Sequence, residues 1–143
     1  MSVLVDTTIW SLALRRRPAD LNAGEHLLVT EWTELVKTGR ARIIGVVRQE
    51  LLSGIKQHAL FEALREALSA FPDERVETED HEAAARAGND CRSKGIAVSL
   101  VDMLLCAVAH RHGMSIFTTD PDFARYARVL HLKLHSAPGK TFQ

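Results

Sequence analysis

The chain has 143 residues, of which 46% are apolar and 25% are charged, and its 18 basic and 18 acidic side chains balance to a formal net charge of zero. These values are typical of a folded globular protein, and the length predicts a single domain over residues 1–143. The balanced charge excludes a protein that holds nucleic acid by bulk attraction alone, because such proteins carry a basic excess.

Membrane and secreted classes are also disfavoured. No apolar run approaches the ~18 residues of a membrane span, and the N-terminal stretch meets an acid at Asp6 before a signal-peptide core can form. The two cysteines, Cys91 and Cys106, form no CxxC pair and cannot build a disulfide framework. We therefore expect a reduced, cytoplasmic protein that makes no membrane contact.

The predicted elements alternate between strands and helices along the chain. Apolar runs predict strands at 3–5, 41–44, 75–78, 115–118 and 129–134. Helical periodicity with cap and stop residues predicts helices at 9–14, 24–37, 46–53, 57–71, 79–94, 99–112 and 121–126, the first of them capped by Thr7 or Thr8. Strands separated by helices pair in parallel. The expected fold class is α/β, a three-layer α/β/α sandwich with a short, mostly parallel sheet of four or five strands.

Three acids stand where a strand gives way to a helix or where a helix starts. Asp6 follows the first strand, and Asp120 follows the strand at 115–118. Asp102 lies in the first turn of a helix opened by Ser99. Groups just past the carboxyl ends of parallel strands converge on one crevice, so the three acids are candidates for a common site. Each also has a plain structural interpretation: Asp6 as an Asx-turn, Asp102 as half of a capping box with Ser99, and Asp120 as an N-cap before a proline.

Glu50 is the fourth candidate. Projection of the helix at ~100° per residue places Glu50 between Val46 and Val47 on the apolar sector. A carboxylate on a buried face is unfavourable by several kcal/mol unless it is paired or bound to a metal. The alternative to a functional role is an ion pair with Arg42 or Arg92.

Four acids in one crevice repel one another, so we expect a cation between them. Oxygen ligands without a nearby Cys or His select Mg²⁺ or Mn²⁺ over zinc. Such ions activate water and stabilise the leaving oxygen of a phosphodiester. The pattern therefore predicts hydrolysis of a nucleic-acid backbone, with Asp6, Asp102 and Asp120 as metal ligands and with Glu50 completing the ligands or orienting the attacking water.

Four segments of the chain, taken together, resemble the PIN-domain ribonucleases, and in particular the VapC-type toxins of bacterial toxin–antitoxin pairs. The segments are 3–10 (VLVDTTIW), 49–54 (QELLSG), 101–109 (VDMLLCAVA) and 116–123 (IFTTDPDF). The resemblance implies a PIN-like fold, RNA as substrate, a homodimer and a cognate antitoxin that folds over a groove of the toxin.

The resemblance also implies residue roles. The metal-binding catalytic acids are then Asp6, Glu50, Asp102 and Asp120. Asp122 is implied as an accessory acid, and Thr7 and Thr119 as hydroxyls that support the acids. The chain departs from the family pattern at two positions: Thr8 stands where many relatives carry Asn or Ser, and Pro121 stiffens the turn after Asp120.

Two other functions fit parts of the pattern. A flavodoxin-like signalling module would bind Mg²⁺ and accept a phosphoryl group. It needs paired acids after the first strand and a lysine after a late one, whereas Asp6 stands alone and no lysine follows 115–119. A catalytically silent binding protein would use the acids only as helix caps.

Three further signals have competing interpretations. The run Arg15–Arg17 is either a solvated helix end or a patch that contacts RNA. Trp10 and Trp32 are expected in the core rather than stacked on bases. The histidines at 131 and 135 would lie too far apart in a strand to bind one zinc ion, and those at 110 and 112 are expected to complement the end of their helix.

Overall fold

The computed structural model, which describes residues 1–138, contains a sheet of three parallel strands in the order β2–β1–β3. The strands are β1 (Val3–Val5), β2 (Ala41–Arg42) and β3 (Ser115–Phe117). In the register of the sheet, Val3 lies opposite Ala41 on one side and Ser115 on the other. All three residues of β1 are buried, as is typical of a parallel strand that is covered on both faces.

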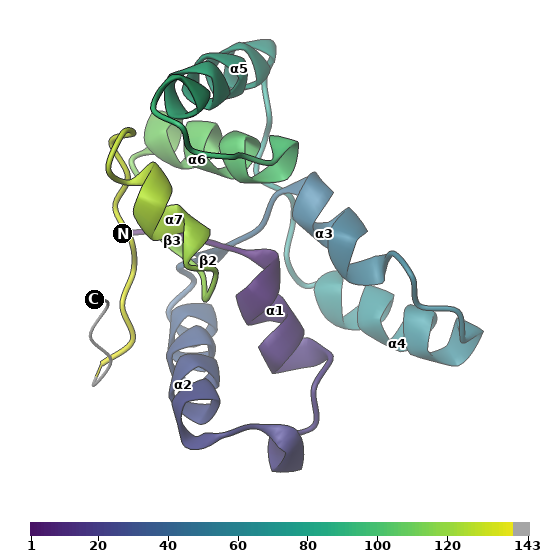
Figure 1. The fold of residues 1–143 in the computed structure, drawn as a ribbon. Coiled ribbons are helices and arrows are strands. Elements are labelled where there is room, and N and C mark those ends of the chain that lie inside the picture. Colours follow the sequence, from purple (N-terminus) through teal and green to yellow (C-terminus); the bar gives the residue numbers. More distant parts are fainter. Residues whose placement is uncertain (139–143) are drawn as a thin grey trace.

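Helices cover the two faces of the sheet and give the predicted three layers. They are α1 (Thr7–Leu14), α2 (Ala23–Lys37), α3 (Gly45–Leu52), α4 (His58–Leu68), α5 (Thr78–Ser93), α6 (Leu100–His112) and α7 (Asp122–Tyr126), with a 3₁₀ turn at Pro18–Asp20. Figure 1 shows α5 and α6 on one side of the strands, α1 and α2 on the other, and α3 with α4 extending sideways. None of the helices within residues 1–138 is long and apolar enough to cross a membrane.

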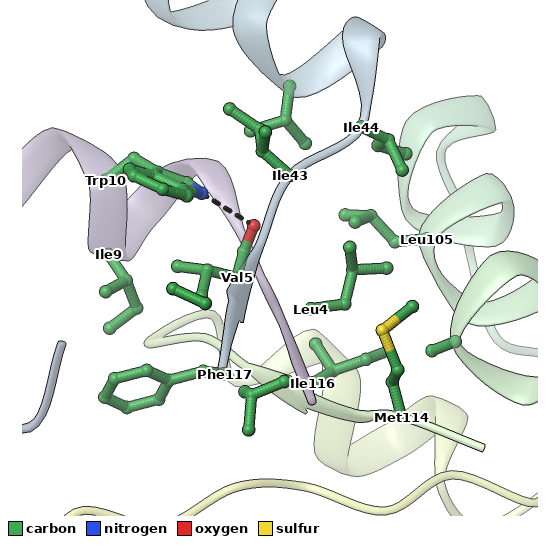
Figure 2. Close-up of a cluster of buried hydrophobic side chains, with 14 of the residues drawn as sticks. Leu4, Val5, Ile9, Trp10, Ile43, Ile44, Leu105, Met114, Ile116 and Phe117 are labelled. Carbon is green, nitrogen blue, oxygen red and sulfur yellow. Dashed lines mark hydrogen bonds between the residues drawn. The ribbon is translucent and has the colours of Figure 1, made fainter. Parts of the chain in front are cut away.

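Trp10 anchors the start of α1 to the end of β1 (Figure 2). Its indole Nε1 donates a hydrogen bond to the carbonyl of Val5 at 3.0 Å. The fully buried ring packs edge-to-face on Trp32 and Phe71, with ring centroids 5.6 and 4.9 Å away. The predicted core position of Trp10 is confirmed, and Trp32 is half-buried against the same core. This packing fixes the turn that carries Asp6.

The helix ends confirm two sequence predictions and correct one. Ser99 caps α6, since its Oγ accepts a hydrogen bond from the backbone N–H of Asp102 at 3.1 Å. Gly113 ends the same helix in the left-handed conformation, with φ of 65°. The predicted cap of α1 by Thr7 or Thr8 is wrong, because α1 begins at Thr7 and the capping position falls on Asp6.

Two predicted strands do not form, so the sheet has three strands and not four or five. At 75–78 the chain enters α5, and an isolated bridge between Ile43 and Asp73 is the pairing observed there. At 129–134 a single bridge joins Leu134 to Ile116. The apolar residues of 129–134 pack against the core all the same. Their alternation therefore indicated burial, which does not require an extended ladder of backbone hydrogen bonds.

Candidate active site

The turns that follow β1 and β3 lie beside each other because the two strands pair in parallel. The backbone N–H of Asp6 donates to the carbonyl of Phe117 at 2.9 Å, so the pairing continues to the last residue before the first turn. Asp120 lies in the second turn, between β3 and α7. The turns that carry Asp6 and Asp120 therefore lie side by side, as expected for the carboxyl ends of adjacent parallel strands.

Three carboxylates lie close enough together to share one metal ion. One oxygen from each of Asp102, Asp120 and Asp122 lies within 4.8 Å of the others, and all three residues are half-buried. Asp122 pairs with Arg125 at 3.0 Å, whereas Asp102 and Asp120 form no salt bridge with any residue of the described chain. The negative charge of this group is therefore largely uncompensated by protein.

This donor set fits a hard divalent cation. All three potential ligands are carboxylate oxygens, which suit Mg²⁺ or Mn²⁺. Cys106 lies one helical turn after Asp102 on α6. Burial raises the pKa of the Cys106 thiol, and the charge of Asp102 adds to the effect, so the sulfur stays protonated and is a poor ligand.

Asp102 is held by a residue that sequence reasoning missed. The hydroxyl of Tyr126 donates to Asp102 Oδ2 at 2.7 Å, so the carboxylate does not complete the capping box with Ser99. Burial raises the pKa of Asp102, and the charges of Asp6 and Asp120 act in the same direction. Tyr126 lies four residues after Asp122 and so shares its face of α7, but no sequence spacing links Tyr126 to Asp102, 24 positions earlier.

Asp6 is 5% exposed, and two threonine hydroxyls bind its carboxylate. Asp6 Oδ2 accepts hydrogen bonds from Thr8 at 2.9 Å and from Thr118 at 2.7 Å. The same hydroxyls accept the backbone N–H groups of Thr119 and Asp120, each at 3.0 Å. Burial raises the pKa of Asp6, and these hydroxyl bonds oppose that rise. The two threonines therefore join the turn after β1 to the turn after β3.

The resemblance implied supporting hydroxyls at Thr7 and Thr119, and the structure distributes these roles differently. Thr7 donates its hydroxyl to Glu50 Oε1 at 2.7 Å, while Thr119 contributes its backbone N–H. Thr118, in contrast, places its hydroxyl directly on Asp6. Asp6 lies outside the group of Asp102, Asp120 and Asp122, so its role as a metal ligand remains a prediction.

Glu50 is exposed, and its predicted place on a buried face is wrong. The physical reason is that α3 buries only the narrow strip of Val47 and Leu51, which leaves the adjacent sector open to solvent. Within residues 1–138 Glu50 forms no ion pair with either of the two arginines considered: Arg42 pairs with Glu74 at 2.9 Å, and Arg92 donates to Asn89 at 3.3 Å. An exposed carboxylate beside Thr7 is available to solvent or substrate, and its catalytic role remains a prediction.

Asp120 combines a structural contact with its place in the acidic group. Its Oδ1 accepts a hydrogen bond from the backbone N–H of Asp122 at 2.9 Å, which braces the turn into α7. The predicted N-cap role of Asp120 is wrong, because α7 begins at Asp122 and the capping position falls on Pro121. The bond also holds the backbone of one acid against the carboxylate of another, which keeps both in the group.

Fold and site together define an α/β protein with a carboxylate cluster at the carboxyl end of a short parallel sheet. The PIN domain profile matches residues 3–129. The chain belongs to the PIN-domain family, as its sequence resemblance predicted.

Similar proteins of known sequence extend over nearly the whole chain. The VapC ribonuclease Mb1587 of Mycobacterium bovis is 28% identical over 136 residues, which cover 94% of this chain and 98% of that protein. Ribonuclease VapC11 of Mycobacterium tuberculosis is also 28% identical, with the same coverage.

Solved structures share the fold at lower sequence identity. A chain in the crystal structure of FitAcB from Neisseria gonorrhoeae superposes with a TM-score of 0.74 at 17% identity, covering 96% of this chain and 99% of that chain. A chain in the structure of VapBC2 from Rickettsia felis bound to a DNA fragment from their promoter has a TM-score of 0.68 at 16% identity, covering 94% and 98% respectively. At these identities the likeness shows the fold.

Proposed function

We propose that this chain is a metal-dependent endoribonuclease that hydrolyses RNA phosphodiester bonds and serves as the toxin of a toxin–antitoxin pair. The observation that carries the proposal is the group formed by Asp102, Asp120 and Asp122, whose carboxylate oxygens lie within 4.8 Å of one another. The likeness to the mycobacterial VapC ribonucleases over 94% of the chain supports the choice of reaction and substrate.

The proposed chemistry assigns a part to each acid. Asp102, Asp120 and Asp122 hold Mg²⁺ or Mn²⁺ through carboxylate oxygens. The ion, when bound, supplies an acidified water and stabilises negative charge on the leaving oxygen. Asp6 adds negative potential next to Asp102 and, through its threonine bonds, fixes the turns that carry the site. Glu50 is an exposed carboxylate that accepts a proton from the attacking water.

A groove between the end of α1 and α4 supports the proposed protein partner. It encloses about 300 Å³ and is lined by Leu14, Arg15, Ile55, Leu60, Ala63, Leu64 and Ala67. Leu60 is 58% exposed, which is unusual for a large apolar side chain on a helix. We propose that a cognate antitoxin covers this groove with apolar and acidic side chains, and that two copies of the chain associate.

Cleavage of RNA by the purified chain tests the reaction. A pool of single-stranded RNA oligonucleotides of random sequence should be cut with Mg²⁺ or Mn²⁺ present and left intact in EDTA. Asp102→Asn should abolish cutting, whereas Asp90→Asn, a matched change of an exposed aspartate on α5, should not. Cleavage that persists in EDTA or in Asp102→Asn would contradict the proposal.

Growth of a bacterial host tests the same proposal without any choice of RNA. Induced expression of the wild type without antitoxin should arrest growth, and expression of Asp102→Asn at the same level should not. Arrest by both chains would indicate an effect independent of the acids. Mapping of new RNA 5′ ends after arrest would then identify the cleaved transcripts.

A further inference from the structure

Tyr126 is the only tyrosine in the sequence, and it ends α7 inside the protein. Its side chain is 1% exposed and packs edge-to-face on Phe123, with the ring centroids 5.2 Å apart. The packed ring places its hydroxyl beside the carboxylate of Asp102. The hydroxyl donates a hydrogen bond to Asp102 Oδ2 at 2.7 Å.

We propose that Tyr126 is a positioning residue for the metal site, which holds the carboxylate of Asp102 in the orientation that the ion requires. The inference rests on the proposed function, because it needs the ion that the function uses. Rotation of an aspartate carboxylate about its last bond is only weakly restricted by its own side chain. An external donor is therefore needed to fix it, and Tyr126 is that donor.

The position of Tyr126 on α7 explains why it acts on the site and not on packing alone. Asp122 begins the same helix and belongs to the acidic group, and residues four apart lie on one helical face. One face of α7 therefore supplies Asp122 to the group and, through Tyr126, orients Asp102 on α6. Asp122 comes from α7 and Asp102 comes from α6, and the hydrogen bond from Tyr126 connects these two helices at the acidic group.

Loss of the hydroxyl alone tests this role. Tyr126→Phe keeps the ring and its packing against Phe123 but leaves Asp102 free to rotate. Residues that orient metal ligands contribute about 10- to 100-fold to metal affinity. Mn²⁺ binding to the full chain, measured by isothermal titration calorimetry, should therefore weaken by about 10-fold or more in Tyr126→Phe.

Thr33→Val provides the matched control for loss of a half-buried hydroxyl. The Thr33 hydroxyl donates to the carbonyl of Val29 within α2 at 2.8 Å, outside the acidic group. Thr33→Val should bind Mn²⁺ as the wild type does. Equal Mn²⁺ affinity in Tyr126→Phe and the wild type would overturn the inference, whatever happens to the melting temperature.

A second measurement needs no substitution. Because the chain has one tyrosine, incorporation of 3-fluorotyrosine gives a single ¹⁹F resonance that reports on Tyr126. Saturation with Mg²⁺ should shift this resonance, and an unchanged resonance while calorimetry records Mg²⁺ binding would overturn the inference. A wild-type chain that binds neither ion would instead remove the metal from the proposed function, and the role of Tyr126 with it.

Discussion

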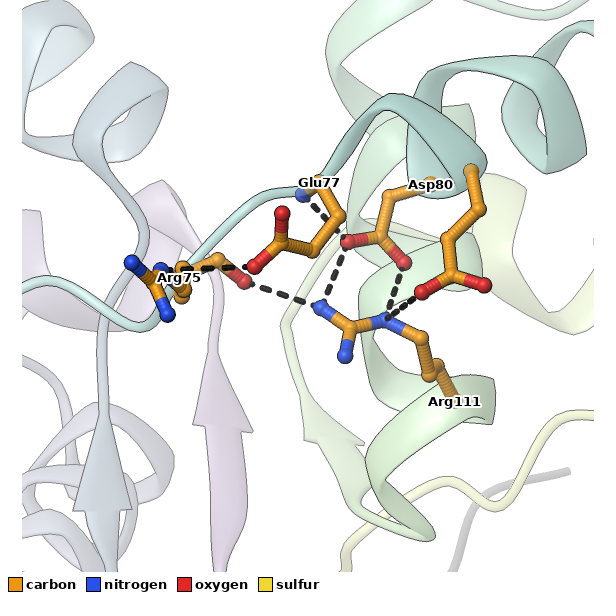
Figure 3. Close-up of polar contacts among 5 residues, drawn as sticks. Arg75, Glu77, Asp80 and Arg111 are labelled. Atoms are coloured by element: carbon orange, nitrogen blue, oxygen red, sulfur yellow. Dashed lines mark hydrogen bonds and ion pairs between the residues drawn. The ribbon is translucent and has the colours of Figure 1, made fainter.

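Arg111, at the end of α6, forms two hydrogen bonds with the carboxylate of Asp80, in the first turn of α5, at 2.6 and 2.7 Å (Figure 3). Asp80 is 1% exposed, and its Oδ2 also accepts the backbone N–H of Glu77 at 2.8 Å. Arg111 donates in addition to the carbonyl of Arg75 at 3.1 Å. These bonds join the start of α5 to the end of α6, the helix that carries Asp102.

Asp80→Asn should lower the melting temperature by about 5 °C at pH 7, because it leaves the Arg111 guanidinium without its buried partner. The hydrogen bonds from Arg111 lower the pKa of Asp80 below its usual 3.8. The stabilisation is therefore complete above pH 3.8 and disappears as the pH falls through the lowered pKa. Thermal unfolding from pH 7 to pH 2 should show the two chains converging in acid.

The exposed pair Glu62–Arg65, with a 2.9 Å contact, supplies the control for Asp80→Asn. Glu62→Gln should shift the melting temperature by about 1 °C or less, because solvent screens an exposed ion pair. An Asp80→Asn effect as small as this would show that the bonds from Arg111 contribute little to stability.

Asp102→Asn should stabilise the metal-free chain by about 1 to 3 °C at pH 7. Burial raises the pKa of Asp102, so the folded state favours the protonated acid, and the cost of ionisation appears as the pH rises through that pKa. Asparagine removes the charge and keeps an oxygen that accepts the Tyr126 hydroxyl. Scanning fluorimetry in EDTA and in Mn²⁺ should show the wild type gaining stability from the ion and the variant gaining none. A variant less stable than the wild type in EDTA would contradict this account.

The parts of the fold that were predictable from sequence are those whose local pattern and tertiary environment agree. Val3–Val5 is an apolar run buried on both faces, and Ser99 with Gly113 marks both ends of α6, so these elements could be placed from residues alone. The apolar residues at 129–134 carried a strand pattern, but they are buried by packing and pair only at Leu134. Burial and strand pairing give the same pattern, which explains the overestimate of the strand count.

The candidate site shows a similar division. The turn positions of Asp6 and Asp120 follow from strand order, and a helix start places Asp102. The exposure of Glu50 depends on how far α4 and its neighbours cover α3, which a helical projection cannot supply. The bond from Tyr126 to Asp102 joins residues 24 positions apart in sequence through tertiary packing, so spacing alone gave no indication of that partner.

Thr118→Val should reduce RNA cleavage about 10-fold, because it removes the hydroxyl that links Asp6 to the turn carrying Asp120. Valine keeps the branched shape of the buried side chain, so the substitution removes the hydrogen bonds of the hydroxyl and leaves the packing nearly unchanged. Thr38→Val removes an exposed hydroxyl at the end of α2 and should leave cleavage unchanged. Cleavage at the wild-type rate by Thr118→Val would show that the link is dispensable.

Glu50→Gln separates catalysis from stability. The side chain is exposed and glutamine still accepts the Thr7 hydroxyl, so the free energy of unfolding should change by less than about 0.5 kcal/mol. If Glu50 accepts a proton from water, cleavage should fall at least about 100-fold. Glu34→Gln, at an exposed position on α2, should alter neither quantity. Unchanged cleavage by Glu50→Gln would remove Glu50 from the proposed chemistry.

Replacement of Arg15, Arg16 and Arg17 by alanine should weaken RNA binding and flatten its dependence on salt. Arg17 pairs with Asp20 at 3.1 Å and Arg16 donates to the Asp20 carbonyl, so part of this charge is already engaged. We expect the slope of log affinity against log salt to fall by about 1 to 2, since each phosphate contact on a single strand contributes about 0.7. Titration of labelled RNA with the protein at salt concentrations from about 50 to about 300 mM measures this slope. An unchanged slope would assign these arginines to a solvated helix end.

The outer strands of the sheet are very short, and one isolated bridge lies at or next to each of them. Past β2, Ile43 bridges to Asp73, and beside β3, Ile116 bridges to Leu134. Long unpaired strand edges allow other chains to add to a sheet and aggregate. Within residues 1–138 such an edge is limited to two or three residues on either side. The edges of this sheet therefore offer too few free backbone groups to pair with a full strand of another chain.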